Sequence, residues 1–199
     1  MVLRECNTEN AIFNDYRAYW ENFESIAQSY KTLPIREWSD WQAVNGFYDE
    51  MRGTLKKDGY WADYDWSNNP GGGFWAFWYG DSQFDRISVD DYSAEFYLQI
   101  ESEWNKETRA YDIMICSKLK NLSPDRNDNR FLRLKGLILQ NQVEYGFHKP
   151  KKLGSGKHIT MGVYRGTPYL NGKEICEAIY SSLKNHEKLV ALLREQMKK

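Results

Sequence analysis

The feature that most constrains the fold is an alternation of apolar and polar side chains from Tyr92 to Glu101. Because successive side chains of a β-strand point to opposite faces, this pattern predicts a strand with one buried face and one face toward solvent. The same alternation from Tyr111 to Leu119 predicts a second strand, antiparallel to the first across the polar segment 102–109. A further short strand is expected at 158–164.

The segment NPGGGFWAFW at 69–78 is typical of a turn that leads into a strand. Asn and Pro start turns, and glycines allow a positive φ or a close approach of the backbone. The aromatic run 74–79 then enters the sheet.

Helices are expected at the N-terminus. From Asn10 to Tyr30 apolar residues recur at steps of three and four, the spacing of one helical face. Pro34 opens a second helix, since proline suits the first helical turn. Residues 1–58 are therefore predicted to form a helical hairpin.

Two more helices are expected after the strands. Ser123-Pro124-Asp125 offers an N-cap, a proline at the first position and an acid in the first turn of a helix at about 124–145. Asn171 with Glu174 resembles a capping box for a last helix at 172–198. With no internal repeat or linker, the fold is predicted as one α+β domain over 1–199, in which residues 59–199 form an antiparallel sheet with two further helices.

Composition narrows the class of protein. No run approaches the roughly 18 apolar residues of a membrane helix, and the start of the chain lacks the features of a signal peptide, so we expect a cytoplasmic location. The three cysteines are far apart, and free thiols explain them better than disulfides or metal binding.

Charge is distributed unevenly along the chain. Residues 1–108 hold 9 Lys and Arg against 20 Asp and Glu, a net charge of −11, whereas residues 109–199 hold 18 against 8, a net charge of +10. A basic half suggests a nucleic-acid or acidic-partner surface. The alternative is that the two halves neutralise each other in the fold.

No catalytic or metal-binding motif is found. The three histidines stand apart from each other and from any Cys, which excludes a zinc signature. The segment 154–157 lacks the first glycine and the hydroxyl residue of a phosphate-binding loop. A magnesium-dependent nuclease would need a carboxylate two positions before a strand lysine, and Cys116 stands there before Lys118. We therefore predict no catalytic residue, metal or cofactor.

Basic and aromatic residues give the positive signals. Arg126, Arg130 and Arg133 share one helical face by their spacing. Cations with aromatic side chains between them suit a groove that follows a nucleic-acid backbone. A solvated charged loop beside an aromatic core is the simpler alternative. The candidate nucleic-acid-binding residues are Arg130, Arg133, Lys149, Lys151, Lys152 and Lys157 for phosphate, with Trp75 and Tyr97 for stacking.

Three segments together resemble the C-terminal region of bacterial proteins of the PD-(D/E)XK nuclease superfamily: NPGGGFWAFW (69–78), YLQIE (97–101) and KPKKLGSGKHITMGV (149–163). The helical residues GFYDEM (46–51) fit the same region. Departures include Gly71 where the family has Ser, and Tyr79 in place of a second Trp. The catalytic residues of that family lie upstream of the matched region, so none is assigned here.

The resemblance implies a non-catalytic accessory domain of a nuclease-like protein, either a fragment or an independently encoded relative. We expect it to engage DNA, RNA, a nuclease domain or another partner chain. The first alternative is a protein-interaction module that self-associates through its acidic and basic halves. The second is an enzyme whose site is assembled from scattered residues such as Gln99, Glu101 and His158.

Overall fold

The computed structural model describes residues 10–38, 41–68, 73–83, 85–90, 92–105, 109–123, 125, 127–150, 152–164 and 169–198. Its helices are α2 (Ala11–Gln28), α3 (Trp41–Lys57), α4 (Asn129–Asn141) and α5 (Gly172–Met197). Its strands are β1 (Trp61–Ser67), β2 (Phe74–Gly80), β3 (Asp85–Val89), β4 (Tyr92–Asn105), β5 (Ala110–Asn121), β6 (Phe147–His148) and β7 (His158–Tyr164). Short 3-10 turns lie at Ser29–Lys31, Ile35–Glu37 and Gln142–Tyr145.

The strands form one seven-stranded antiparallel sheet in the order β1-β2-β4-β5-β7-β6, with β3 paired to the first part of β4. The predicted α+β class, with an N-terminal helix pair followed by a sheet and two helices, is confirmed. The strands expected at 111–119 and 158–164 coincide with β5 and β7.

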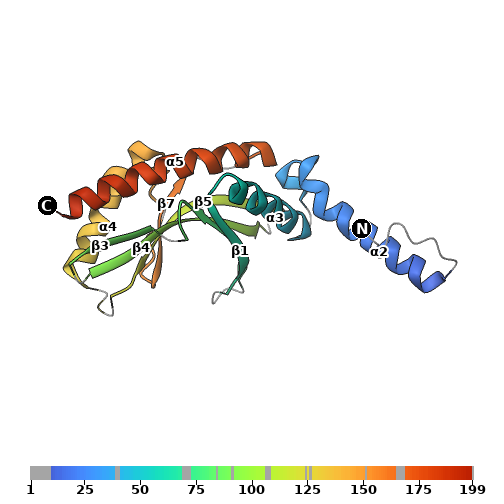
Figure 1. The fold of residues 1–199 in the computed structure, drawn as a ribbon, viewed down its shortest axis with the longest axis horizontal. Coiled ribbons are helices and arrows are strands. Elements are labelled where there is room, and N and C mark those ends of the chain that lie inside the picture. The colour runs from blue at the N-terminus through green and yellow to red at the C-terminus, as the bar shows by residue number, and fades with distance from the viewer. Residues whose placement is uncertain are drawn as a thin grey trace.

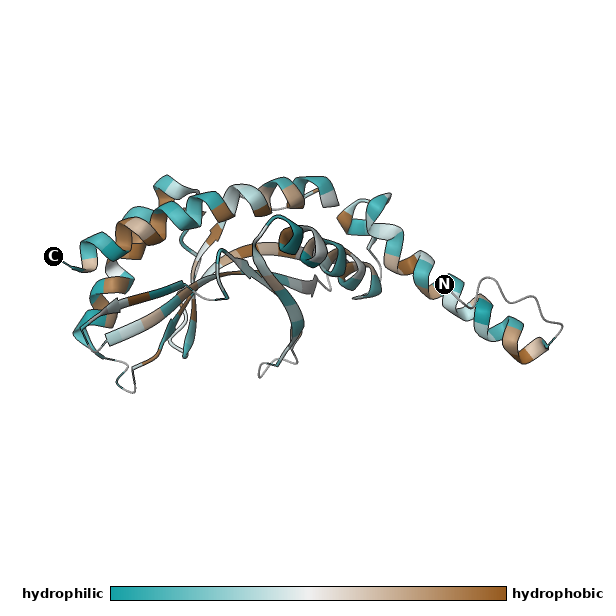
Figure 2. Ribbon diagram, in the orientation of Figure 1, coloured by the Kyte–Doolittle hydropathy of each residue, from teal (hydrophilic) through white to brown (hydrophobic). Residues whose placement is uncertain are grey.

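The sheet has one face covered by helices and one that the helices leave open. In Figure 1 the sheet arches below α3 and α5, which lie on the same side of it. Phe96, Leu98 and Ile100 of β4 point to the helices and are fully buried. Hydrophobic and hydrophilic segments alternate along α5, which buries one side of its length against the sheet (Figure 2). The alternation of β4 therefore separates the two faces as expected.

The N-terminal hairpin is attached to the sheet through α3, while most of α2 extends away from the body (Figure 1). None of the residues of α2 is buried. The two helices cross closely at Gly46, where an added Cβ would lie 1.9 Å from the carbonyl oxygen of Ala27.

The predicted start of the second helix at Pro34 is wrong. A 3-10 turn at Ile35–Glu37 places the fully buried Trp38 in the core, and α3 begins at Trp41.

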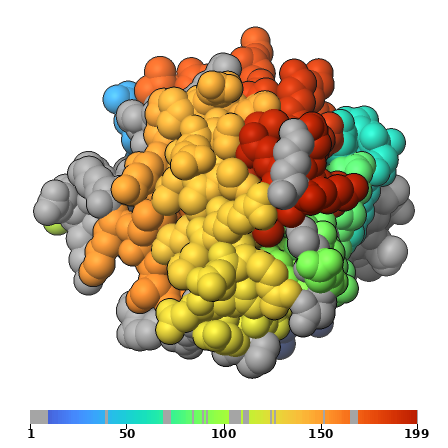
Figure 3. All heavy atoms as spheres, turned by 90° about the vertical axis from the view of Figure 1, so that its left-hand side faces the viewer, coloured from blue at the N-terminus to red at the C-terminus, as the bar shows by residue number. Residues whose placement is uncertain are grey.

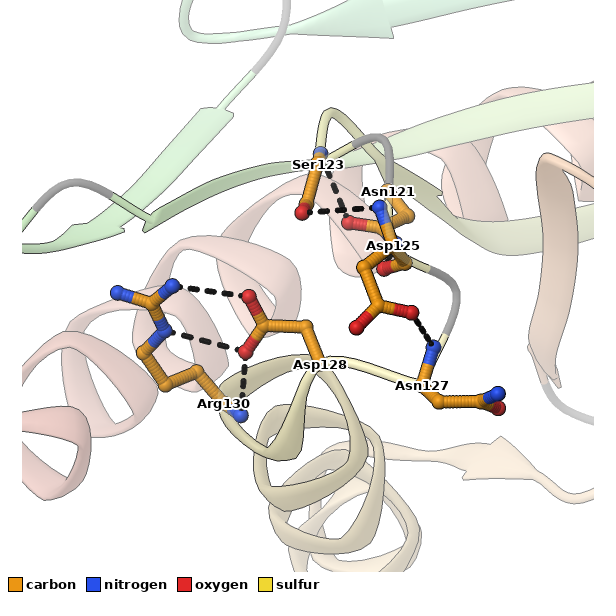
Figure 4. Close-up of polar contacts among 6 residues, drawn as sticks. All are labelled: Asn121, Ser123, Asp125, Asn127, Asp128 and Arg130. Atoms are coloured by element: carbon orange, nitrogen blue, oxygen red, sulfur yellow. Dashed lines mark hydrogen bonds and ion pairs between the residues drawn. The ribbon is translucent and has the colours of Figure 1, made fainter.

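The predicted start of α4 is also wrong, because Ser123 is not the N-cap. Its side-chain oxygen accepts from the amide of Asp125 and its own amide donates to the side chain of Asn121, which makes a separate turn (Figure 4). Asp128 caps α4 instead, by accepting from the amide of Arg130 at 2.8 Å. Pro124 and Arg126 lie outside the described residues. The last helix begins as predicted. Asn171 caps it by accepting from the amide of Glu174, and the Glu174 carboxylate accepts from the amide of Leu170, one residue before the cap.

No helix in the described part of the chain is long and apolar enough to cross a membrane.

Candidate nucleic-acid interface and the open-face pocket

A hollow lies between the start of α4 and the connection from β6 to β7. It has a volume of about 700 Å³, and Phe131 and Ile159 are the buried apolar residues of its wall. Lys135 lines it from α4, and Ser155 and Lys157 line it from the connection. Figure 3 shows this side of the molecule, where the yellow surface of α4 adjoins the orange surface of the segment that includes 152–164. The end of one strand, one helix and one loop thus enclose a polar hollow with two cations.

Two lysines line this hollow, and two more stand on the connection from β6 to β7. We call Lys135, Lys149, Lys152 and Lys157 the lysine surface; the last three are exposed. Within the ranges that the structure describes, none of the four forms an ion pair. Lys151 lies outside the described residues. Positive charge therefore remains unneutralised here.

Elsewhere the acidic and basic halves do neutralise each other. Three cations of the second half form ion pairs with acids of the first half: Lys118 with Glu101 at 2.6 Å, Lys120 with Glu95 at 2.6 Å, and Arg194 with Asp85 at 3.2 Å. The uneven charge of the sequence is therefore partly cancelled in the fold, and the lysine surface is a part that is not cancelled.

The two arginines on α4 are engaged inside the molecule. Arg130 donates from Nε and Nη2 to the carboxylate of Asp128 at 3.1 and 2.9 Å (Figure 4), and its guanidinium lies 5.4 Å from the ring centre of Tyr92. Arg133 donates to the backbone carbonyl of Gln196 at 2.8 Å. Neither lines the hollow. The structure therefore does not bring these arginines together with the lysines as one phosphate-binding row.

The two proposed stacking residues lie on opposite faces of the sheet. Trp75 pairs with Ser102 in the register of β2 and β4, so it points to the helix side, where it stacks on Trp41 at 6.1 Å with an interplanar angle of 16°. Tyr97 points to the open face, but it is only 5% exposed. The structure does not bring these two rings together in one groove, because paired residues share a face and the strand alternation separates Trp75 from Tyr97.

The open face carries a pocket of its own, with a volume of about 390 Å³. Three segments that stood out in the sequence meet there. Phe74 and Trp78 come from NPGGGFWAFW, Tyr97 and Gln99 from YLQIE, and His158 from the basic third segment. The remaining lining residues are Ser67, Asn68, Glu95, Lys118 and Lys120. We call this cavity the open-face pocket.

A chain of hydrogen bonds orients the side chains along one side of this pocket. Trp78 Nε1 donates to Gln99 Oε1 at 2.9 Å, and Gln99 Nε2 donates to Glu101 Oε1 at 3.1 Å. Lys118 Nζ donates to the same carboxylate oxygen at 2.6 Å and to Thr160 Oγ1 at 2.8 Å. Both polar atoms of the Gln99 amide are thus used, and its orientation is fixed.

The other side of the pocket pairs Tyr97 with His158, whose ring Nδ1 lies 2.9 Å from the tyrosine hydroxyl. Burial lowers the pKa of His158, and the cations Lys120 and Lys157 lower it further. The imidazole is therefore neutral at neutral pH. Burial also raises the pKa of the Tyr97 hydroxyl, which keeps its proton.

The ion pairs on the open face carry a desolvation cost, because their charged groups are largely removed from solvent. Glu95 and Gln99 line the open-face pocket and are only 5% and 4% exposed. A buried ion pair recovers little more than its own desolvation cost, so it adds little to stability compared with apolar packing.

The residues of the enzyme alternative lie close together in the structure. Gln99 and His158 line the same pocket, and Glu101 joins them through the amide of Gln99. Cys116 is buried, and burial raises the pKa of its thiol, so it is not a nucleophile at neutral pH. Among the described residues, no group of three or more His, Cys, Asp or Glu could hold a metal ion.

Sequence reasoning missed Trp78, Glu95 and Lys120 as pocket residues. The sequence pattern could have identified Glu95 and Lys120, since polar residues at alternate positions of two predicted neighbouring strands can share one face of the sheet. Lys118 and Lys120 alternate along β5 and lie opposite Tyr97 and Glu95. Lys135 was missed because its contribution depends on where the loop to β7 passes.

No protein-family model, no curated protein and no solved structure matches the chain. The resemblance to the PD-(D/E)XK nuclease superfamily therefore stays a prediction.

Proposed function

We propose that this chain is a non-catalytic module that binds nucleic acid through the lysine surface, as an accessory domain of a nuclease-like protein. The observation that carries the proposal is the set of four lysines without a counter-charge beside a polar hollow. Lys135 and Lys157 line that hollow, and Lys149 and Lys152 stand exposed on the adjoining connection. Exposed ammonium groups that face solvent are suited to phosphates of a flexible backbone.

The absence of internal partners supports this assignment over a structural role. Lys118 and Lys120 are each paired with a carboxylate inside the molecule, at a donor–acceptor distance of 2.6 Å. Lys152 and Lys157 have no such contact among the residues that the structure describes. Their charge is free to attract an anion.

Salt titration tests the proposal with a fluorescein-labelled single strand of thymidines and fluorescence anisotropy. Four phosphate contacts give a slope of log K against log salt of about −2.8, so affinity falls about fiftyfold between 50 and 200 mM salt. The double variant Lys152→Ala/Lys157→Ala removes two contacts and halves the slope.

The matched control is Lys56→Ala/Lys57→Ala, which removes the same charge from two exposed lysines at the end of α3. It leaves the slope unchanged. Absence of binding at 50 mM salt, or equal loss of affinity in both double variants, contradicts the proposal.

A second candidate function is self-association of two copies, favoured by the surface of α2. This helix buries none of its residues, and its exposed side chains include Ile12 at 81%, Tyr16 at 50% and Tyr19 at 62%. It also carries a net charge of −2 over Ala11–Gln28, from three acids and one Arg, which is complementary to the lysine surface of a second copy. Light scattering checks this: a mass that rises with concentration and drops in Tyr19→Lys supports it, whereas a monomer at all concentrations excludes it.

A further inference from the structure

We propose that the open-face pocket receives one unstacked base of the nucleic-acid strand whose phosphates the lysine surface holds. The inference rests on the proposed function. Its starting point is that three segments far apart in the sequence contribute Trp78, Gln99 and His158 to one cavity.

The pocket and the hollow are neighbours at one end of the sheet, where β5 ends and β7 begins. Lys157 lines the hollow and the next residue, His158, lines the pocket. On the adjacent strand Asn121 lines the hollow and the preceding Lys120 lines the pocket, and Lys120 pairs with His158 in the register of β5 and β7. Consecutive residues of a strand point to opposite faces. A strand of nucleic acid that passes around the end of β5 and the start of β7 can therefore reach both cavities.

Charge distinguishes the two cavities. In the pocket the ammonium groups of Lys118 and Lys120 are offset by the carboxylates of Glu101 and Glu95, and neutral His158 adds no charge. Arg86 also lies 3.9 Å from Glu95, but its side chain is 69% exposed and does not line the pocket. Lys135 and Lys157 line the hollow and form no ion pair with any residue that the structure describes. A phosphate is attracted to surplus positive charge, so it suits the hollow and not the pocket. The pocket suits a neutral polar ligand.

The chemistry of the pocket wall fits a planar heterocycle. Phe74 and Trp78 are partly exposed rings of β2 on the open face, which supply surfaces for stacking. Glu95 accepts from Lys120 through one carboxylate oxygen, which leaves its other oxygen as an acceptor for a ligand. Lys118 donates to Glu101 and Thr160, and the third proton of its ammonium group is available as a donor. A base edge presents both donors and acceptors, and stacking on an aromatic side chain needs no particular base. The volume of about 390 Å³ lies within the range of ligand pockets and accommodates one base.

An oligonucleotide of twelve thymidines and a matched twelve-residue abasic strand, which keeps every phosphate, test the inference by anisotropy. The wild-type chain binds the thymidine strand about tenfold more tightly than the abasic strand, since base stacking adds to the phosphate contacts. Trp78→Leu lowers the affinity for thymidines to the level of the abasic strand and leaves abasic binding unchanged. The control Trp66→Leu, at an exposed ring of β1 that pairs with Trp75 and shares its face, keeps the tenfold difference.

His158→Ala provides a second variant at an exposed position, in case Trp78→Leu does not fold. It reduces the difference between the two strands without changing the salt slope. Free thymidine, which carries no phosphate, competes with the thymidine strand only down to the abasic level. This competition measurement distinguishes binding of a base within a strand from binding of a free nucleoside.

Each outcome decides between the two proposals. Salt-dependent binding of both strands with equal affinity overturns the base pocket and leaves the lysine surface intact. Equal loss of both strands in Trp78→Leu also overturns the base pocket. Failure of both strands to bind at 50 mM salt overturns the proposed function and, with it, this inference.

Discussion

The core of the molecule contains a histidine that makes its stability depend on pH. His186 of α5 is 2% exposed, and its ring lies 4.7 Å from the centre of Phe96 and 6.5 Å from that of Phe147. Its Nε2 has no hydrogen-bond partner among the described residues. Asp85 of β3 lies 3.6 Å from Nδ1, and Arg194 of α5 pairs with Asp85. Burial, followed by the charge of Arg194, lowers the pKa of His186 from 6.5 to about 3.

The sign follows from where the proton binds. The unfolded chain takes up a proton at His186 below pH 6.5, whereas the folded chain keeps the ring neutral down to about pH 3. The contribution to stability is therefore complete above pH 6.5 and is lost as the pH falls from 6.5 toward 3. At pH 5 the loss is about 2 kcal/mol, from about 1.4 kcal/mol for each of 1.5 pH units. Burial raises the pKa of Asp85, which acts in the opposite direction at lower pH.

Urea denaturation at pH 7 and pH 5 measures this loss. His186→Phe removes the titrating ring, and any cost of repacking is the same at both pH values. We expect the wild-type chain to lose about 2 kcal/mol more than His186→Phe on acidification. His148→Gln, at an exposed position of β6, serves as the control and behaves as the wild type. An identical pH dependence of the wild-type chain and His186→Phe would refute the reasoning.

Two further predictions concern the helices. Gly46→Ala places a methyl group against the carbonyl of Ala27 and costs about 2 kcal/mol in thermal unfolding, whereas Gly53→Ala, with nothing within 4 Å, is neutral or stabilises by up to about 1 kcal/mol. Asp128→Ala removes the cap of α4 and costs about 1 kcal/mol, and Ser123→Ala costs less than half of that; the reverse order in urea denaturation would restore Ser123 as the cap.

Local sequence patterns predicted helices and strands well where a pattern is compatible with only one structure. The alternation in β4 and the N-cap at Asn171 each have a single physical solution, and both match the structure. The start of α4 was harder because Ser123, Asp125 and Asp128 are all able to cap a helix. The first two form hydrogen bonds within the preceding turn, which leaves Asp128 for the helix. The spacing of these residues in the sequence does not show which of the competing side-chain acceptors caps the helix.

The site was predicted less well because it depends on register. The run 74–79 contains only large apolar residues and one Ala, so no polar residue sets which rings face the helices. The sequence of this run therefore does not decide that Trp75 faces the helices and Trp78 faces the pocket. The burial of Tyr97 depends on Lys118 and His158, which strand pairing brings beside it.

The alternation of β4 has a consequence for how such a protein can change. Residues at even positions, such as Phe96 and Leu98, hold the core, whereas Tyr97 and Gln99 at odd positions line the pocket. Substitutions at odd positions alter what the pocket accepts without repacking the core, and substitutions at even positions do the reverse. A library randomised only at odd positions of this strand would therefore diversify ligand preference on a constant scaffold.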